Sequence, residues 1–460
     1  MTPHHCLRRS LARVAVAGLA ALSLALPTTG ADAAAGAGPA PVARATTNPV
    51  TPGNFTGYGF DQCLAPTQKA MDAWLESSPF WAVGIYISGN SRHCRDQPNL
   101  TPTWISTQLA NGWRLLPITL GPQAYCNPRY PKYGPKIDPV IKRDPTNGYA
   151  AAKAQGVAEA TKAVGVATKL GIAPKSTLWY DLEAFDIKNK GCRLSAISFL
   201  DGWTEQLHEL GFVSGAYSSG GSGIIAIDNA RVNRATFDEP DMIWVADWSG
   251  APFEFTGTWL RDGAWLPGRR VHQYRGGHDE THGGVRINID SNFLDTGLGS
   301  VPKPAKPICN GTVIDFARYT PLDLGTKQVA RTKAAQCLLK RIKLYTGPIS
   351  GAYDARTGAA TSAYRTRLGL PAGTAFDRVV WTARLAAGRT PLMKYGAYGP
   401  GVRRLQRALN AAVGAQLPIT GTFASATTAA VKKYQDRFDL PMTGVVTEQL
   451  WALLQHRVVE

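Results

Sequence analysis

Two acidic side chains, Asp181 and Glu183, stand two residues apart at the end of an apolar and aromatic run that spans residues 176–185. Side chains on a strand alternate between its two faces, so both carboxylates are predicted to point to the same side. Burying two charges is unfavourable unless chemistry or dedicated hydrogen bonds require it. Hydrolysis of a glycosidic bond is one such chemistry, because it needs a proton donor of raised pKa beside a second, ionised carboxylate.

The elements that must position this pair belong to residues 54–298, where short β-branched and aromatic runs alternate with longer helical patterns. That alternation predicts an α/β fold with a parallel sheet. We expect strands at residues 57–61, 82–87, 114–120, 177–183, 212–217, 242–247, 270–274 and 286–290. We expect helices at residues 67–76, 103–111, 147–170, 194–210 and 222–230, and irregular connections after Trp248 and Tyr274.

Eight strands within about 245 residues are typical of a (β/α)8 TIM-like barrel. A doubly wound open sheet is the alternative, but no dinucleotide-binding or P-loop glycine motif follows the first strand. In a barrel the chemistry lies at the C-terminal ends of the strands. Besides the first pair, those predicted ends carry Asp61, Tyr217, Asp247, Trp248, Gln273, Tyr274 and Asp290. Trp248 is a candidate platform for a sugar, since aromatic faces pack on the apolar faces of pyranose rings.

Several of these strand ends form recognisable motifs: Tyr58–Asp61, Tyr180–Glu183, Ile243–Trp248, His272–Tyr274 and Ile289–Asp290. They resemble the strand-end motifs of the family 25 glycoside hydrolases, the lysozymes that cut bacterial wall glycan. The whole span 54–298, with Cys63, Cys94 and Gly112–Pro117, more closely resembles the secreted bacterial glycoside hydrolase-like domain of unknown function that is related to those lysozymes.

The resemblance to the lysozymes implies a role for each acid. Glu183 would be the general acid that protonates the leaving oxygen, and it is favoured over Asp181 because it lies further toward the mouth. Asp181 would be the partner carboxylate that orients or stabilises the reacting groups. Alternatively, it would be a buried carboxylate that forms hydrogen bonds to neighbouring strands. Asp61 and Asp290 would hold substrate or assist catalysis, and Gln273 and Tyr274 would line the cleft.

After a Pro/Lys linker at residues 299–308, the chain repeats itself at a constant offset of 70 residues. The offset superposes Gln336 on Gln406 and Trp381 on Trp451, which indicates a tandem duplication. Each copy, residues 309–388 and 391–458, is predicted to be a small all-α unit of three helices, at 402–413, 425–438 and 447–454 in the second. Both resemble the peptidoglycan-binding domain attached to many wall hydrolases. The first copy departs from that pattern at Arg365, where Gln is preferred.

The N-terminus predicts export. Three arginines precede an apolar run at residues 14–26 and an Ala31-Asp32-Ala33 cleavage pattern, which together are typical of a secretory signal over residues 1–33. The run is too short to span a bilayer, and no later stretch is long and apolar enough, so no stable membrane insertion is expected. Residues 34–53, rich in Ala, Gly, Pro and Thr, are interpreted as a flexible tether.

Export makes disulfides the natural interpretation of the six cysteines that follow the signal. The domain division isolates Cys309 with Cys337, and the other four allow three pairings. We favour Cys63–Cys94 and Cys126–Cys192, because each pair flanks successive strand ends.

The net charge of +17 is concentrated after residue 307, where 21 Lys and Arg face 8 Asp and Glu. A basic terminal domain on an exported protein favours peptidoglycan and anionic wall polymers as partners over nucleic acid. No metal or cofactor is expected: His278 and His282 lie in a Gly-rich stretch and are interpreted as solvated, and residues 218–223 lack a nucleophile elbow. Two functions remain open, a wall-glycan hydrolase and an inactive barrel that binds or organises wall glycan.

Overall fold

The computed structural model describes residues 47–234, 236–253 and 258–456. The predicted signal, residues 1–33, and residues 34–46 of the predicted tether lie outside the described residues. The remainder of the tether differs from its prediction: Thr51 is buried, and its backbone N–H donates to Ser176 Oγ over 3.1 Å while its hydroxyl donates to the Leu115 carbonyl over 2.8 Å. Ordered structure therefore starts before Asn54. None of the described helices is long and apolar enough to cross a membrane.

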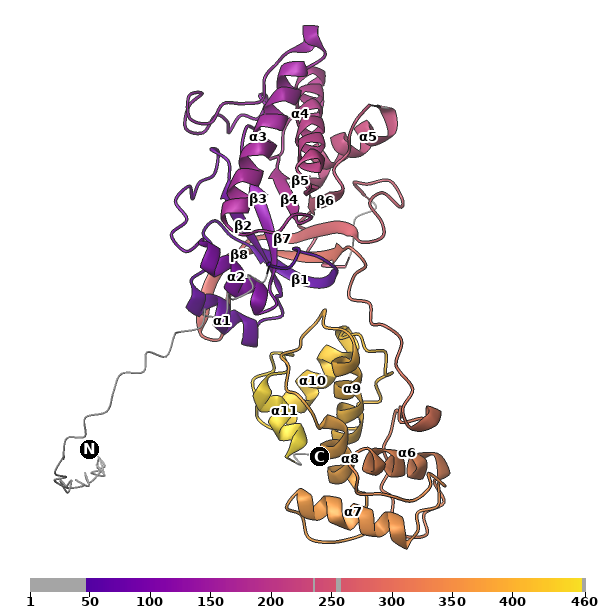
Figure 1. Ribbon diagram of the computed structural model, residues 1–460. Helices are drawn as coiled ribbons and strands as arrows, with labels where there is room; N and C mark the ends of the chain where they lie inside the picture. The colour runs from indigo at the N-terminus through magenta and orange to yellow at the C-terminus, as the bar shows by residue number, and fades with distance from the viewer. Residues whose placement is uncertain (1–46, 235, 254–257, 457–460) are drawn as a thin grey trace, which may run out of the picture. The chain divides into compact units, whose positions relative to one another are not determined.

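Eight strands close into a barrel in chain order, which confirms the predicted fold (Figure 1). They are β1 Phe55–Asp61, β2 Ala82–Ser88, β3 Arg114–Thr119, β4 Thr177–Asp181, β5 Val213–Ser219, β6 Met242–Ala246, β7 Arg269–His282 and β8 Val285–Thr296. Within the described residues, five α-helices follow the first five strands: α1 Gln68–Ser77, α2 Pro102–Ala110, α3 Ala150–Lys169, α4 Lys190–Glu209 and α5 Ile225–Asn233, with a short π-helix at Gly220–Ile224 before α5.

Local capping and close packing explain these helices. Thr67 and Thr101 accept hydrogen bonds from the first-turn N–H groups of Ala70 and Trp104 and so begin α1 and α2. Helices α3 and α4 lie side by side because a glycine on one faces the backbone of the other (Figure 1). A Cβ at Gly156 would stand 2.0 Å from the Phe199 carbonyl oxygen, so any larger residue would force the two helices apart.

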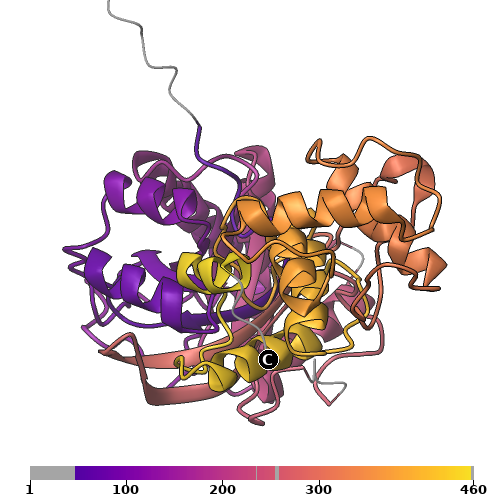
Figure 2. The same cartoon turned by 90° about the horizontal axis from the view of Figure 1, so that it is seen from below.

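The last strand departs from the parallel barrel that we predict. β8 runs antiparallel to both β7 and β1, and β7 continues through the stretch that we expected to be a Gly-rich loop. The two strands form a long ribbon beside α1, where the Trp74 indole N–H donates to the Val285 carbonyl over 2.9 Å (Figures 1 and 2). Because β8 starts at the mouth and runs back, Asp290 lies inside the strand rather than at its end, level with Asp61.

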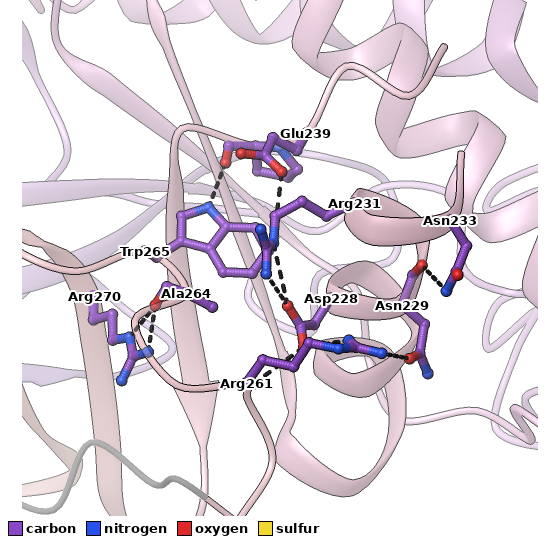
Figure 3. A network of polar contacts seen from close by, with 10 residues as sticks. Asp228, Asn229, Arg231, Asn233, Glu239, Arg261, Ala264, Trp265 and Arg270 are labelled. Carbon is purple, nitrogen blue, oxygen red and sulfur yellow. Dashed lines mark hydrogen bonds and ion pairs between the residues drawn. The ribbon is translucent and has the colours of Figure 1, made fainter. Parts of the chain in front are cut away.

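An ion-pair network around the buried Asp228 anchors the connection between β6 and β7 to α5 (Figure 3). Asp228, whose side chain is 3% exposed, accepts from Arg231 over 2.8 Å and from Arg261 over 2.6 Å. Trp265 donates to the Pro240 carbonyl over 2.7 Å in the same region. Burial acts to raise the pKa of Asp228, but the hydrogen bonds from Arg231 and Arg261 outweigh it and lower that pKa.

Asp228→Asn is expected to destabilise the protein by about 2 kcal/mol at pH 7, because Arg261 loses its anion and Arg231 keeps only the 3.7 Å pair with Glu239. Since the folded-state pKa of Asp228 is lowered, its contribution is present above about pH 4 and is lost as the pH falls through the folded value. Urea unfolding at pH 7 and pH 3 should therefore show a smaller difference in stability between wild type and variant at pH 3 than at pH 7. The exposed Asp262→Asn is the matched control; equal effects of both substitutions would contradict a special role for Asp228.

The C-terminal region contains the two predicted three-helix units. The first has α6 Val329–Lys340, α7 Ala355–Arg367 and α8 Arg378–Ala386, and the second has α9 Pro400–Ala412, α10 Ser425–Arg437 and α11 Glu448–Gln455. The duplication extends to single hydrogen bonds: Gln336 donates to Thr357 Oγ1 and accepts from the Gly351 N–H, and Gln406 does the same with Thr427 and Gly421.

Arg365, the departure in the first copy, has a structural reason. In the second copy Gln435 donates to Thr443 and to the Val445 carbonyl. Arg365 instead donates to the Ala375 carbonyl and forms an ion pair of 2.5 Å with Asp377. Arg365 thus stabilises, in the first copy, the turn that Gln435 stabilises in the second, but through different hydrogen bonds.

All three favoured disulfides are present: Cys63–Cys94, Cys126–Cys192 and Cys309–Cys337. The first joins the loops after β1 and β2. The second joins the loop after β3 to the first turn of α4. Both crosslinks lie next to the strand ends where the candidate site was predicted.

Candidate active site

Three carboxylates from β1, β4 and β8 meet at the mouth of the barrel. Asp61 and Asp181 are 4% and 2% exposed, and Asp61 and Asp290 are paired across β1 and β8. The Gln273 side-chain amide donates to both members of that pair, over 3.1 Å to Asp61 Oδ2 and 3.3 Å to Asp290 Oδ2. Gln273 is itself buried, so it holds the acids in place rather than lining an open cleft as the resemblance implied.

Further donors orient this arrangement. The oxygen of Gln273 accepts from the Tyr217 hydroxyl and from the Trp248 indole N–H, each over 3.0 Å. Asn292 donates to Asp61 Oδ2 over 2.8 Å and accepts from the Trp244 indole over 2.8 Å. The orientation of Asp61 is therefore set by two amides, each of which has its own aromatic partner.

Burial raises the pKa values of these acids. Burial first, and the neighbouring Asp290 second, raise the pKa of Asp61 to about 8, although the bonds from Asn292 and Gln273 act against the change. Burial also raises the pKa of Asp290, opposed by the Gly277 N–H and by His278. At neutral pH we expect Asp61 to be largely neutral.

Asp181 is the most deeply enclosed of the acids. Burial, followed by repulsion from Glu183, raises the pKa of Asp181 well above its usual value. The Tyr86 hydroxyl donates to its Oδ2 over 3.2 Å. Its Oδ1 is buried and has no hydrogen-bond partner within the described part of the chain. A protonated Asp181 leaves one fewer charge without compensation in this environment.

Glu183 has a different environment, which corrects the prediction of two buried charges on one strand. β4 ends at Asp181, and Glu183 lies in the loop beyond it with a side chain that is 29% exposed. Gln123 holds this turn by donating to the Asp181 carbonyl over 2.7 Å and accepting from the Glu183 N–H over 2.8 Å. The Glu183 carboxylate forms an ion pair of 2.9 Å with Arg129.

The loop after β3 supplies two residues that the sequence did not indicate. Arg129 pairs with Glu183, and Tyr130 follows it; burial, then Glu183 and Asp181, raise the pKa of Tyr130. Neither residue stands in a periodic pattern or at a strand end. The one available signal was Cys126, because its disulfide to Cys192 holds this loop close to the end of β4. Tyr86 and Asn292 were missed as well.

The other predicted residues are less central. No described hydrogen bond joins the side chain of Asp247 to the acids; its backbone N–H donates to the Gln273 carbonyl over 3.1 Å. Burial raises the pKa of Tyr274 to about 12, while a hydrogen bond to Ser291 acts against the change. Trp248 is 65% exposed, and its ring lies so close to Gly276 that a Cβ there would be 2.4 Å away. Its position is thus fixed while its outer face stays open.

A cavity of about 560 Å³ opens beside the acids. Asp61, Tyr86 and Asp290 line it, and the Cys63–Cys94 disulfide forms part of its wall. It offers space for a sugar ring next to two of the carboxylates. Asp181 and Glu183 do not line it.

The two histidines interpreted as solvated lie instead on β7. Their side chains are 8% and 20% exposed, and His278 and His282 flank Glu280 at 3.1 and 2.8 Å. Among the described residues, no group of three or more His, Cys, Asp or Glu side chains is arranged to hold a metal ion.

Comparison with known families gives two matches. Residues 72–294 match the family described as Rv2525c-like, glycoside hydrolase-like domain, and residues 398–454 match the peptidoglycan binding domain. No curated protein matches the chain.

Solved structures show similarity as well, and three of them are described here. An uncharacterized protein of B. stearothermophilus has 20% identity and a TM-score of 0.33, covering 52% of this chain and 97% of its own. The Tat-secreted protein Rv2525c of Mycobacterium tuberculosis, in complex with L-tartrate, has 14% identity and a TM-score of 0.33, covering 52% and 95%. The modular autolysin LytC of Streptococcus pneumoniae has 11% identity and a TM-score of 0.30, covering 52% and 46%.

Proposed function

Because this cell-wall-associated chain carries an Rv2525c-like, glycoside hydrolase-like domain and a peptidoglycan-binding domain, we propose that its barrel hydrolyses the glycan strands of peptidoglycan. The second domain brings the barrel to its substrate. Three disulfides are consistent with action outside the cell, since such bonds persist in oxidising compartments. The basic C-terminal region adds attraction to anionic wall polymers.

The observation that carries the proposal is the division of the acids into two environments. Asp61 and Asp181 are buried and have raised pKa values, whereas Glu183 reaches the open side and is paired with a cation. A glycosidase needs one carboxyl group that keeps a proton and one that is ionised, placed together at a cleft. A purely structural role would not require three carboxylates from separate strands at one mouth.

In the proposed mechanism Glu183 is the group that exchanges protons with the sugar, because Asp181 and Asp61 are too enclosed to contact it. Once separated from Arg129 it takes up a proton and gives it to the leaving oxygen as the glycosidic bond breaks; water then adds to the anomeric carbon, and the proton released from that water returns to Glu183. An arriving sugar first displaces Arg129, whose side chain is 64% exposed and free to move outward. Asp181 lies two residues before Glu183, and burial raises its pKa well above the usual value. Gln273 and Asn292 hold Asp61 and Asp290 against the other side of the sugar.

The test is release of reducing sugar ends from purified peptidoglycan by the full-length protein between pH 4 and 8. A time-dependent increase above a heat-inactivated sample supports hydrolysis. Binding to the same walls without any release, across several wall preparations, would reject hydrolysis and leave the barrel as a recognition domain.

Trp248→Ala is expected to weaken binding of soluble glycan fragments about tenfold while leaving the melting temperature almost unchanged. The exposed ring face is lost, but few buried contacts go with it. Trp248→Phe should keep most of the binding, because it retains an aromatic face without the indole N–H that bonds Gln273. Fluorescence titration with glycan fragments measures the affinity of both variants. Unchanged affinity in Trp248→Ala would show that sugars do not contact this ring.

A further inference from the structure

Three arginines lie at the C-terminal ends of the helices in the first repeat. Arg341 follows the last residue of α6, Arg367 ends α7, and Arg384 lies in the last turn of α8. The Arg384 Nε donates to the Leu338 carbonyl of α6 over 3.0 Å. Burial lowers the pKa of Arg384; Tyr364 acts against this change and Arg341 adds to it. Burial also raises the pKa of Tyr364, which Arg384 and Arg367 both oppose, so the three cations gather around this side chain.

No acid of the first repeat neutralises this arginine cluster of Arg341, Arg367 and Arg384. Residues 309–388 contain 12 Lys and Arg but only 4 Asp and no Glu. Each Asp is engaged elsewhere: Asp315 pairs with Arg407, Asp377 pairs with Arg365, Asp323 accepts from Thr374, and Asp354 accepts from Thr357. In the described part of the chain, no ion pair joins the arginine cluster to a carboxylate.

The second repeat shows that the fold does not require two of these arginines. At the offset of 70 residues, Arg341 corresponds to Ala411 and Arg384 to Leu454, which are 2% and 0% exposed. Cations stabilise helix C-termini, but α9 and α11, both described in full, form with no basic residue in their last turns. A half-buried guanidinium is less favourable than an apolar side chain unless a partner compensates its lost hydration. The two arginines therefore indicate an anionic ligand.

The arrangement of the cluster indicates which anion. Guanidinium groups bind phosphate through two parallel hydrogen bonds, which favours phosphate as the ligand group. Arg341 and Arg367 are exposed and Arg384 is half-buried, so all three belong to the surface of the repeat. Three cations on three separate helices fit the regularly spaced charges of a polymer better than a single small ion.

We propose that the arginine cluster of the first repeat is a binding site for the phosphodiester groups of an anionic wall polymer. The inference rests on the proposed function for the location of the partner, because it takes the partner to be a component of the wall. It assigns the two repeats different ligands: the first binds a phosphodiester polymer, and the second brings the barrel to peptidoglycan.

Calorimetry with the full-length protein tests this site, with poly(glycerol phosphate) as the probe and polygalacturonate of similar length as a carboxylate polymer. We expect the wild type to bind the phosphate polymer about tenfold more tightly than the carboxylate polymer at low salt, and both affinities to fall as salt screens the charges. Vesicles of phosphatidylglycerol present phosphodiesters on a membrane and should bind more weakly than poly(glycerol phosphate).

Substitutions assign the binding to the cluster. The double variant Arg341→Ala/Arg384→Leu introduces the side chains that the second repeat has at these positions, so it should fold with an unchanged or higher melting temperature. Its affinity for poly(glycerol phosphate) should fall about tenfold. The matched control Lys327→Gln/Arg356→Gln also removes two positive charges, but before α6 and in the first turn of α7. The 12 residues of α6 separate Lys327 from Arg341 by about 18 Å, so the control should lose less than about twofold.

Equal loss of affinity in the two double variants would overturn the site, by showing a general effect of charge. Equal binding of the two polymers by the wild type, or stronger binding to the vesicles, would overturn it even if the arginine variant failed to fold. Reducing-end release from peptidoglycan stripped of anionic polymers is measured on the same samples and should be equal in wild type and variant. Absence of release from both, with the polymer preference intact, rejects only the proposed reaction.

Discussion

Replacing Glu183 by glutamine is expected to lower the rate of reducing-end release by about 100- to 10,000-fold, the range associated with loss of a general acid. Glutamine keeps the size of the side chain but cannot transfer the proton. Folding should change by less than about 1 kcal/mol, because Glu183 and its partner Arg129 are both partly exposed. Glycan binding should therefore persist while turnover is lost, which separates an enzyme from a binding protein.

One further substrate and one further variant make this result specific. If Glu183 protonates the leaving oxygen, a glycoside with a strongly acidic leaving group should recover much of the rate in Glu183→Gln, since it needs no protonation. The exposed Glu209→Gln is the matched control and should behave as wild type. Full turnover in Glu183→Gln would assign the proton to Asp181 or Asp61 instead.

Asp61→Asn is expected to stabilise the protein by about 4 kcal/mol at pH 7. The pKa of this carboxyl group is about 8 in the folded protein, against about 3.9 in an unfolded chain. Between these values the unfolded state releases the proton while the folded state keeps it, which costs about 1.4 kcal/mol per pH unit. The stability contributed by the protonated group is therefore complete below about pH 4 and is lost as the pH rises toward 8.

Asparagine cannot ionise in either state, so the pH dependence due to this site should disappear in the variant. Urea unfolding at pH 4, 5.5 and 7 should show that Asp61→Asn is as stable as wild type at pH 4 and increasingly more stable than wild type at the two higher pH values. The exposed Asp96→Asn, in the loop that follows β2, should change stability at none of these values. A variant that is less stable than wild type at pH 7 would mean that Asn292 and Gln273 hold Asp61 as an ionised carboxylate.

Much of this protein was predictable because its signals are local. Runs of β-branched and aromatic residues and longer helical patterns depend on neighbours only a few residues away, and they predicted all eight strands and the first five helices. The caps by Thr67 and Thr101 are equally local. The offset of 70 residues predicted two equivalent units, and the buried glutamines Gln336 and Gln406 repeat the same bonds. A cysteine pairing could be chosen because crosslinks must join segments that end at the same rim.

The direction of β8 and the environment of each acid were decided only by tertiary structure. A strand has the same apolar pattern whether it runs parallel or antiparallel, so the pattern could not show that β8 turns back and sets Asp290 level with Asp61. Likewise, spacing placed Asp181 and Glu183 together, but whether a carboxylate is buried or paired depends on distant segments. Tyr86 from β2 encloses the first, and Arg129 from the loop after β3 neutralises the second. The raised pKa of Asp181 and the exposure of Glu183 therefore arise from packing between segments that are far apart in the sequence.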